Sequence, residues 1–248
     1  MSVAEENHVH ALYAASVTAV DRWIGRLLEK LETLRLDRNT LLIFLSDHGH
    51  LLGEHGLHGK PTGPYGRLYE VTARVPLLVR HPAGLGAGRW IPDIAQHPDL
   101  LPTILDYLDI PRPADLPGRS LWPAINGKDS NPRPYAFSGR FARTAGERVV
   151  CDAERFDSRA GGDGGGEPTT VTSNEWALVC PPGTEGRELY HLPSDPRQGH
   201  DVIGANPDVA DRMHRAFVEL LKESGAIPER IRLYTEPQPS PGWPTRLR

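Results

Sequence analysis

Residues 41–60, LLIFLSDHGHLLGEHGLHGK, place polar and charged side chains directly after a short apolar run. The run at residues 41–45 is followed by adjacent Asp47 and His48, and a glycine-rich bend then leads to Lys60, thirteen residues after the aspartate. In open α/β sheets the ligand crevice lies at the carboxyl ends of the strands, so polar residues that directly follow a strand face a binding site. The segment therefore predicts both a sheet and a site at its edge.

The three polar residues suit a metal ion and an anion held side by side. Asp47 and His48 can each offer a lone pair to a cation, and Lys60 can offer a positive charge to an oxyanion. An Asp-His-Gly tripeptide is common by itself and is often no more than a turn. In this setting the combination favours the hydrolysis of esters of sulfur or phosphorus.

The flanking sequence predicts how the segment is built into a sheet. Residues 41–45 are short, apolar and bounded by polar residues, a pattern typical of a buried strand in a parallel sheet. Residues 74–80 are predicted to form a second strand, and residues 8–36 a helix. The apolar side chains of this helix, Trp23 among them, are expected to pack against the core.

Composition narrows the class of protein. The 248 residues are 38% hydrophobic, which is enough for one large or two smaller domains. The formal net charge of −4 and the pI near 6.3 argue against a nucleic-acid surface. Two cysteines provide no disulfide framework. No apolar run reaches the roughly 18 residues of a membrane span, and no signal-peptide pattern is present, so we expect no membrane insertion and a cytoplasmic location.

The sequence divides near Asn126 into two parts and a tail. Residues 1–126 are predicted to form an α/β core with the metal loop, and residues 228–248 an extended tail. Residues 127–227 are predicted to form a small antiparallel sheet and a C-terminal helix, with strands at 148–151, 176–180 and 189–192 and the helix at 207–224. Residues 161–166 are predicted to be a flexible linker, because no helix follows them to bind phosphate.

Several motifs occur in the order and spacing of one known family. They are Ser46-Asp47-His48-Gly49, Gly53-Glu54-His55-Gly56, Lys60, Arg74-Val75-Pro76-Leu77, residues 98–106, residues 118–121, and Glu188-Leu189-Tyr190-His191-Leu192 with Asp195-Pro196. On these motifs the chain resembles the sulfatase family of the alkaline phosphatase superfamily, over residues 8–225. The resemblance implies an α/β fold with a mixed or parallel sheet flanked by helices, followed by a small C-terminal α+β subdomain with an antiparallel sheet.

The resemblance also implies a role for the polar residues of the opening segment. Asp47 and His48 match two ligands of a divalent cation, most often Ca²⁺ in sulfatases, and Lys60 matches a residue that contacts the sulfate group. Histidine is a less usual ligand than oxygen for a hard cation, so Mn²⁺, iron or Zn²⁺ stays an alternative. His58 is a candidate for the sulfate or substrate pocket because it lies two residues before Lys60.

Four neighbouring histidines leave another interpretation open. His48, His50, His55 and His58 lie within eleven residues, a spacing that can assemble a zinc site. In the resemblance, His55 belongs to the Gly-Glu-His-Gly turn, while His50 and His58 stand where relatives more often carry acidic and aromatic residues. Loop structure or substrate-pocket lining is therefore favoured over zinc ligation.

The sulfatase nucleophile has no counterpart in this sequence. In the family, a formylglycine made from Cys or Ser in a Cys/Ser-x-Pro-x-Arg sequence is the nucleophile, and an early strand supplies paired aspartates. Cys151 and Cys180 stand in other sequences, and no serine fits the pattern. We therefore expect the chain to represent the C-terminal part of a sulfatase, incomplete on its N-terminal side, and to be inactive by itself.

Three functional hypotheses follow from the resemblance. The first is a metal-dependent hydrolase of sulfuric esters that acts on a small sulfate ester or a sulfated sugar. The second is a phosphonate or phosphodiester hydrolase of the same superfamily, for which Mn²⁺ or Zn²⁺ is favoured over Ca²⁺. The third is a non-catalytic truncated relative or one half of a split enzyme, which would form a homo-oligomer or bind a complementing N-terminal half. None of them implies a nucleic-acid or membrane partner.

Overall fold

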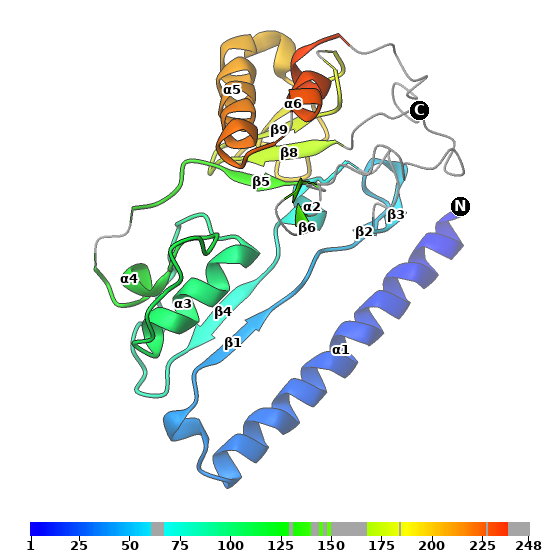
Figure 1. The fold of residues 1–248 in the computed structure, drawn as a ribbon. Helices are drawn as coiled ribbons and strands as arrows, with labels where there is room; N and C mark the ends of the chain where they lie inside the picture. Colours follow the sequence, from blue (N-terminus) through cyan, green and yellow to red (C-terminus); the bar gives the residue numbers. More distant parts are fainter. Residues whose placement is uncertain are drawn as a thin grey trace. The chain divides into compact units, whose positions relative to one another are not determined.

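The computed structural model describes residues 1–60, 67–128, 131–139, 144–145, 148–149, 168–183, 185–226 and 228–237. The chain forms two compact units (Figure 1). The first unit combines Met1–Asp47 with Val75–Arg133, and the second combines His48–Arg74 with Pro134–Arg248. The glycine-rich segment after Asp47 thus belongs to the second unit. The domain boundaries predicted from the sequence stay a prediction, and the predicted linker at 161–166 lies outside the described residues.

Helix α1 (Val3–Thr33) opens the first unit with a capping box. The Glu5 N–H donates to Ser2 Oγ, and the Ser2 N–H donates to the Glu5 carboxylate at 2.7 Å, so two backbone amides at the helix start are satisfied. Although α1 has 31 residues, no helix in the described part of the chain is both long and apolar enough to cross a bilayer.

The apolar face of α1 is uncovered in the described part of the first unit. The sequence predicts that this face packs against the core, but none of the helix residues is buried, and Trp23 is 66% exposed. Helical periodicity indicates which face is apolar and contains no information about what covers it. The packing expected for this helix is therefore not found among the described residues.

Strands β1 (Leu42–Leu45) and β4 (Leu77–Arg80) form a two-stranded antiparallel sheet with Leu42 opposite Arg80. Both strands lie where the sequence predicts them. The expectation that residues 41–45 form a buried strand of a parallel sheet is wrong for the β1–β4 pair. Strand β4 runs antiparallel to β1, and Phe44 is 43% exposed. An apolar run favours burial but does not specify the direction of the partner strand.

In the first unit, short helical segments follow β4. The 3₁₀ turn η3 (His97–Asp99) and helix α3 (Leu100–Tyr107) cover the motif at residues 98–106, and helix α4 (Trp122–Ile125) comes after a turn. Gly118 in that turn has φ +92°, and a Cβ atom there would lie 2.2 Å from the Pro98 carbonyl oxygen. Only glycine fits this position without a shift of the backbone.

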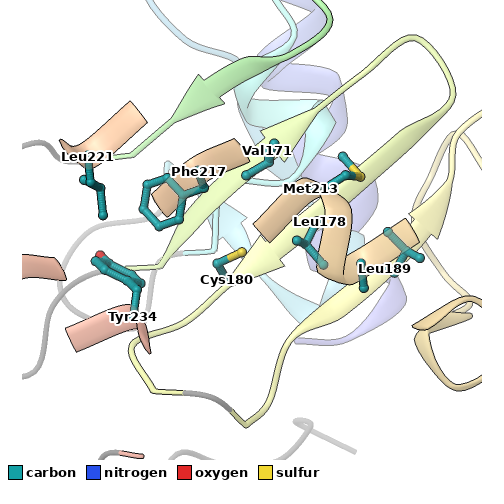
Figure 2. Packing of buried hydrophobic residues seen from close by; sticks show 9 residues of the cluster. Val171, Leu178, Cys180, Leu189, Met213, Phe217, Leu221 and Tyr234 are labelled. Atoms are coloured by element: carbon teal, nitrogen blue, oxygen red, sulfur yellow. The ribbon is translucent and has the colours of Figure 1, made fainter. Parts of the chain in front are cut away.

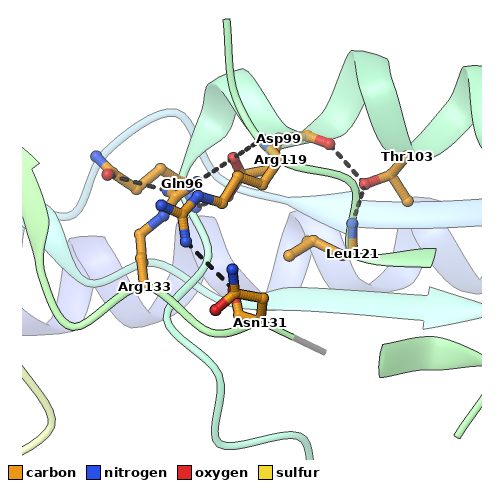
Figure 3. A network of polar contacts seen from close by, with 7 residues as sticks. All are labelled: Gln96, Asp99, Thr103, Arg119, Leu121, Asn131 and Arg133. Carbon is orange, nitrogen blue, oxygen red and sulfur yellow. Dashed lines mark hydrogen bonds and ion pairs between the residues drawn. The ribbon is translucent and has the colours of Figure 1, made fainter. Parts of the chain in front are cut away.

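The fully buried carboxylate of Asp99 joins these segments (Figure 3). It accepts hydrogen bonds from the backbone N–H groups of Gln96 at 2.7 Å and Arg119 at 2.8 Å. It also forms an ion pair with Arg133, at 2.5 Å between Oδ1 and Nη2. Thr103 donates its hydroxyl proton to the Asp99 carbonyl oxygen. These hydrogen bonds and the ion pair compensate the cost of burying the Asp99 carboxylate.

The second unit contains a four-stranded antiparallel sheet in the order β10–β9–β8–β5. Its strands are β5 (Ala136–Ser138), β8 (Thr169–Thr172), β9 (Trp176–Cys180) and β10 (Glu188–His191). A separate antiparallel pair is formed by β6 (Thr144–Ala145) and β7 (Arg148–Val149). The predicted small antiparallel sheet is confirmed, while the last two residues of the strand predicted at 148–151 lie outside the described part of the chain.

The core of the second unit lies between this sheet and helix α5 (Pro207–Glu223), as Figure 2 shows. Val171, Leu178 and Leu189, on three neighbouring strands, are fully buried. The helix contributes residues spaced three and four apart, which is the spacing of one helical face: Ala210, Met213, Phe217 and Leu221. The helix predicted at 207–224 is therefore confirmed.

Helix α6 (Pro228–Thr235) replaces the first part of the predicted extended tail. Tyr234 is fully buried, and its ring lies edge-on to Phe217 with 4.9 Å between centroids. The proline-rich composition after residue 228 predicts an extended chain, but burial of this tyrosine against α5 stabilises a helix instead. Residues 238–248 lie outside the described part of the chain.

Candidate metal and sulfate site

The segment between Gly49 and Lys60 folds into a tight β-hairpin. Strand β2 (Leu51–Leu52) pairs antiparallel with β3 (His58–Gly59), and Leu51 lies opposite Gly59. At the tip, Gly53 has φ +119°, and its N–H donates to the Leu57 carbonyl oxygen at 2.9 Å. The hairpin ends at Lys60, whose side chain is exposed. The predicted sulfate-binding residues His58 and Lys60 are therefore two positions apart, on the same face of a strand and its extension.

Asp47 is an exposed residue at the carboxyl end of the first unit's β1 segment. The Ser46 hydroxyl lies 3.5 Å from Asp47 Oδ1. The Ser46 carbonyl oxygen lies 2.9 Å from His97 Nε2, a donor when that nitrogen carries the ring proton. The backbone beside Asp47 is thus held within its own unit, and its carboxylate can be a hard oxygen ligand.

His48 begins the second unit's segment and is half-buried. Its Nδ1 lies 2.8 Å from the Gly49 carbonyl oxygen, a contact that requires the proton on Nδ1. This tautomer places the ring's lone pair on Nε2. Histidines that bind metals commonly donate their other ring N–H in this manner.

Gly49 fits closely against helix α2 (Glu70–Ala73). Its N–H donates to the Thr72 carbonyl oxygen at 2.8 Å, and a Cβ atom on Gly49 would lie 1.9 Å from the Val71 carbonyl oxygen. No L side chain fits there without moving one of the two backbones. The glycine of the Ser-Asp-His-Gly motif is therefore required by the close approach of α2.

Helix α2 is in turn fixed by long-range hydrogen bonds within the second unit. The Glu70 N–H donates to Gln198 Oε1 at 2.6 Å, and Thr172 Oγ1 donates to Glu70 Oε1 at 2.7 Å. Burial is the main cause that raises the pKa of the Glu70 carboxyl group, while the hydrogen bond from Thr172 lowers it. Sequence reasoning did not select Glu70 or Gln198, although Gln198 lies three residues after Asp195 of the C-terminal motif.

His55 is part of the hairpin's support. Its ring stacks on Tyr69 with 3.5 Å between centroids and a 6° interplanar angle, and Tyr190 approaches it edge-on. Burial lowers the pKa of His55, and its Nε2 is buried with no hydrogen-bond partner among the described residues. Tyr190 donates to Glu188 at 2.9 Å, and Arg67 pairs with the same carboxylate at 3.1 Å.

The described residues contain no group of three or more His, Cys, Asp or Glu side chains that could together hold a metal ion. The zinc-site alternative for His48, His50, His55 and His58 therefore has no support in the described geometry. The assignment of Asp47 and His48 as metal ligands, and of His58 and Lys60 as sulfate-binding residues, stays a prediction.

Solved structures of similar proteins define the class of this fold. One, determined in complex with its substrate D-glucosamine-2-N,6-O-disulfate, has 27% sequence identity and a TM-score of 0.60 over 86% of this chain and 39% of that chain. Another, a phosphonate monoester hydrolase of Agrobacterium radiobacter, has 25% identity and a TM-score of 0.66 over 88% of this chain and 42% of that chain. The chain thus has an α/β fold of the alkaline phosphatase-like class.

Residues 2–110 match the family model described as Sulfatase, and the chain belongs to the sulfatase family. A curated relative, the N-acetylglucosamine-6-O-sulfatase of Bacteroides thetaiotaomicron, is 38% identical over 213 residues, which cover 86% of this chain and 35% of the relative. The chain spans about a third of the length of the curated relatives it matches.

Proposed function

We propose that this chain carries the cation- and sulfate-binding part of a sulfuric ester hydrolase. In this proposal Asp47 and His48 are two ligands of a divalent cation, and Lys60 and His58 bind the sulfate group. The observation that carries this proposal is the β2–β3 hairpin. It turns the chain back so that Lys60 lies across from His50, two residues after His48. Membership of the sulfatase family supports the same reaction class.

The two proposed ligands fit a divalent cation. Asp47 is an exposed carboxylate, and the contact between His48 Nδ1 and the Gly49 carbonyl oxygen leaves Nε2 as the acceptor nitrogen of that ring. We infer Ca²⁺ as the cation, with Mn²⁺ or Zn²⁺ as the alternatives because one ligand is an imidazole. A bound cation would polarise a non-bridging oxygen of the ester.

Lys60 and His58 would act on the ester's charged group. The Lys60 ammonium supplies a point charge to sulfate oxygens without strict geometry, and the His58 ring supplies an N–H donor. No Cys/Ser-x-Pro-x-Arg sequence occurs among the 248 residues. We therefore propose that this chain binds a sulfate ester and does not hydrolyse it by itself.

We infer a sulfated sugar as the substrate class. A solved structure similar to this chain contains a disulfated glucosamine, and the relative in B. thetaiotaomicron is an N-acetylglucosamine-6-O-sulfatase. The second candidate is a phosphonate or phosphodiester hydrolase, which is favoured by the likeness to the A. radiobacter phosphonate monoester hydrolase. The third is a non-catalytic relative or split-enzyme half that associates with a copy of itself or with a complementing N-terminal half.

Titration calorimetry of the chain with Ca²⁺, Mn²⁺ and Zn²⁺ tests the ligand assignment. We expect Asp47→Asn and His48→Gln each to lower cation affinity at least about tenfold, because each removes one ligand. The matched control is His200→Gln, since the His200 side chain is 89% exposed. Equal affinity in all three variants would contradict the assignment.

Binding of N-acetylglucosamine 6-sulfate and of phenylphosphonate, measured with the cation present, separates the two ester classes. The sulfated sugar should bind more tightly to the wild-type chain, and Lys60→Ala should weaken that binding while Lys222→Ala does not. A preference for the phosphonate would favour the second candidate. Hydrolysis of the sulfate ester by this chain alone would overturn the proposed division of the site.

A further inference from the structure

We propose that His50 is a further substrate-binding residue and that the preferred ligand carries a second anionic group beside the sulfate held by Lys60. This inference rests on the proposed function, because it takes Lys60 as the sulfate-binding residue. It assigns a recognition role to a histidine outside the predicted metal and sulfate residues.

The hairpin register places His50 on the same face as His58 and Lys60. Leu52 lies opposite His58, and Leu51 lies opposite Gly59. The next position in this register, just beyond the paired residues, places His50 opposite Lys60. Side chains alternate between the two faces of a strand. Leu51 is buried at 1% exposure, whereas His50 is half-exposed and Lys60 is exposed. The buried leucine thus marks the inner face, and the three basic residues share the outer one with half-buried Leu52.

Several contacts brace the hairpin that carries this face. The Glu54 carboxylate accepts the Leu52 N–H at 2.6 Å and thereby ties the tip to β2. A Cβ atom on Gly53 would lie 3.6 Å from His58 Cε1, so the His58 ring lies over the tip. The stack of His55 on Tyr69 anchors the same tip to the second unit. A binding face on such a support loses little conformational entropy when a ligand arrives.

The chemistry of the face favours acceptor-rich ligands. Lys60 has three N–H donors, and each imidazole has at least one N–H donor whichever nitrogen carries the proton. Glu54, the acidic residue of the hairpin, accepts a hydrogen bond from the Leu52 backbone N–H. Side chains opposite each other on paired strands are about 5 Å apart at Cβ. A sulfate bound to Lys60 would therefore have His58 beside it on the same strand and His50 beside it on the paired strand. A second anionic group of the ligand can then reach His50.

The experiment compares N-acetylgalactosamine 6-sulfate with N-acetylgalactosamine 4,6-disulfate by calorimetry on the whole chain with Ca²⁺. The wild-type chain should bind the disulfate about tenfold more tightly, as expected for one added charge-assisted hydrogen bond. His50→Ala should abolish that preference, because it weakens binding of the disulfate about tenfold more than binding of the monosulfate. His200→Ala, an exposed histidine away from the hairpin, should preserve the preference.

Each other outcome overturns the inference in a recognisable way. Equal binding of both sugars by the wild-type chain rejects a second anionic group. An equal loss for both sugars in His50→Ala indicates a structural role only, and far-ultraviolet circular dichroism of the variant checks its fold. Lys60→Ala tests the proposed function separately: if it leaves monosulfate binding intact, or if the wild-type chain binds neither sugar, the sulfate site itself is wrong.

Discussion

Asp99 is a fully buried carboxylate whose negative charge is balanced by a neighbouring arginine. Arg133 pairs with it, and that side chain is itself almost fully buried. Removing one partner of a buried ion pair leaves the other charge without compensation, which costs far more than the pair contributes. Without the Asp99 carboxylate, the backbone N–H groups of Gln96 and Arg119 would also lose their hydrogen-bond acceptor.

We therefore expect Asp99→Ala to lower the free energy of unfolding by roughly 3–5 kcal/mol. Urea denaturation of the whole chain, followed by circular dichroism, measures the change. The control is Asp106→Ala, which removes the partner of half-exposed Arg112 at 3.1 Å and should cost no more than about 1 kcal/mol. Similar losses in both variants would mean that burial of Asp99 is not what makes its pair important.

Glu70 is the buried carboxyl group that should produce a pH dependence of stability. Burial raises its pKa above the ordinary value of 4.5, so the folded protein binds this proton more tightly than the unfolded chain does. The group therefore stabilises the fold fully below pH 4.5, and this contribution is lost as the pH rises through the folded pKa.

Glu70→Gln should remove this pH dependence, because the amide keeps an oxygen for the Thr172 hydroxyl and cannot ionise. We expect the Tm of the variant, relative to wild type, to increase as the pH is raised from 4 to 7. Glu219→Gln, an exposed matched change on α5, should leave the difference near zero. A Glu70→Gln Tm that falls relative to wild type over this range would contradict the sign of the pKa shift.

At the scale of elements, the contact between the Asp-His-Gly turn and α2 supports the candidate site. The turn meets α2 through one glycine, and α2 meets strand β8 through the Glu70–Thr172 hydrogen bond. The position of the proposed ligand His48 thus depends on helix α2 and, through it, on strand β8. A side chain at Gly49 should push the turn away from α2 and so displace His48.

Gly49→Ala should lower the free energy of unfolding by about 1–3 kcal/mol, since the added methyl group would lie 1.9 Å from the Val71 carbonyl oxygen. It should also weaken cation binding, because His48 is displaced. The matched control is Gly25→Ala in α1, where no atom lies within 4 Å and the helix should gain about 0.5–1 kcal/mol. Thermal denaturation and calorimetry of both variants check the pair, and a stabilised Gly49→Ala would rule out the close contact.

For the molecule as a whole, the exposed apolar surface of the first unit is the main feature that its own packing does not explain. Exposed apolar residues occur at helical spacing along α1, at positions Val20, Trp23 and Leu27. On the two-stranded sheet of the same unit, Phe44 and Leu78 are also exposed. Surface of this kind drives association in water.

The 248-residue chain should therefore self-associate at micromolar concentration. Trp23→Glu should shift it toward the monomer, because a charge cannot be buried in an apolar contact without a partner. Size-exclusion chromatography with light scattering measures the mass, and Glu29→Gln on the same helix is the control. A wild-type chain that stays monomeric and monodisperse would contradict this prediction.

Local sequence was sufficient for most elements. The apolar runs at β1, β4 and β9, and the apolar face of α5, have the period of the structure they form, so their positions could be predicted. The direction of β4 could not, because an apolar run is compatible with either pairing. Helix α6 was missed because its stability comes from burying Tyr234 against Phe217, a contact that composition does not contain.

The sequence by itself determined the sulfatase motifs, and with them the order and spacing of Asp47, His48, His58 and Lys60. These are properties of the covalent chain and of short-range turns. The tertiary structure alone decided that His55 stacks on Tyr69, that Gly49 meets α2, and that His50 shares a face with Lys60. It also brought Glu70 to Gln198, 128 positions away. Such contacts depend on the packing of distant elements, and the free energy that selects them comes from burial and from hydrogen bonds that form only in the folded chain.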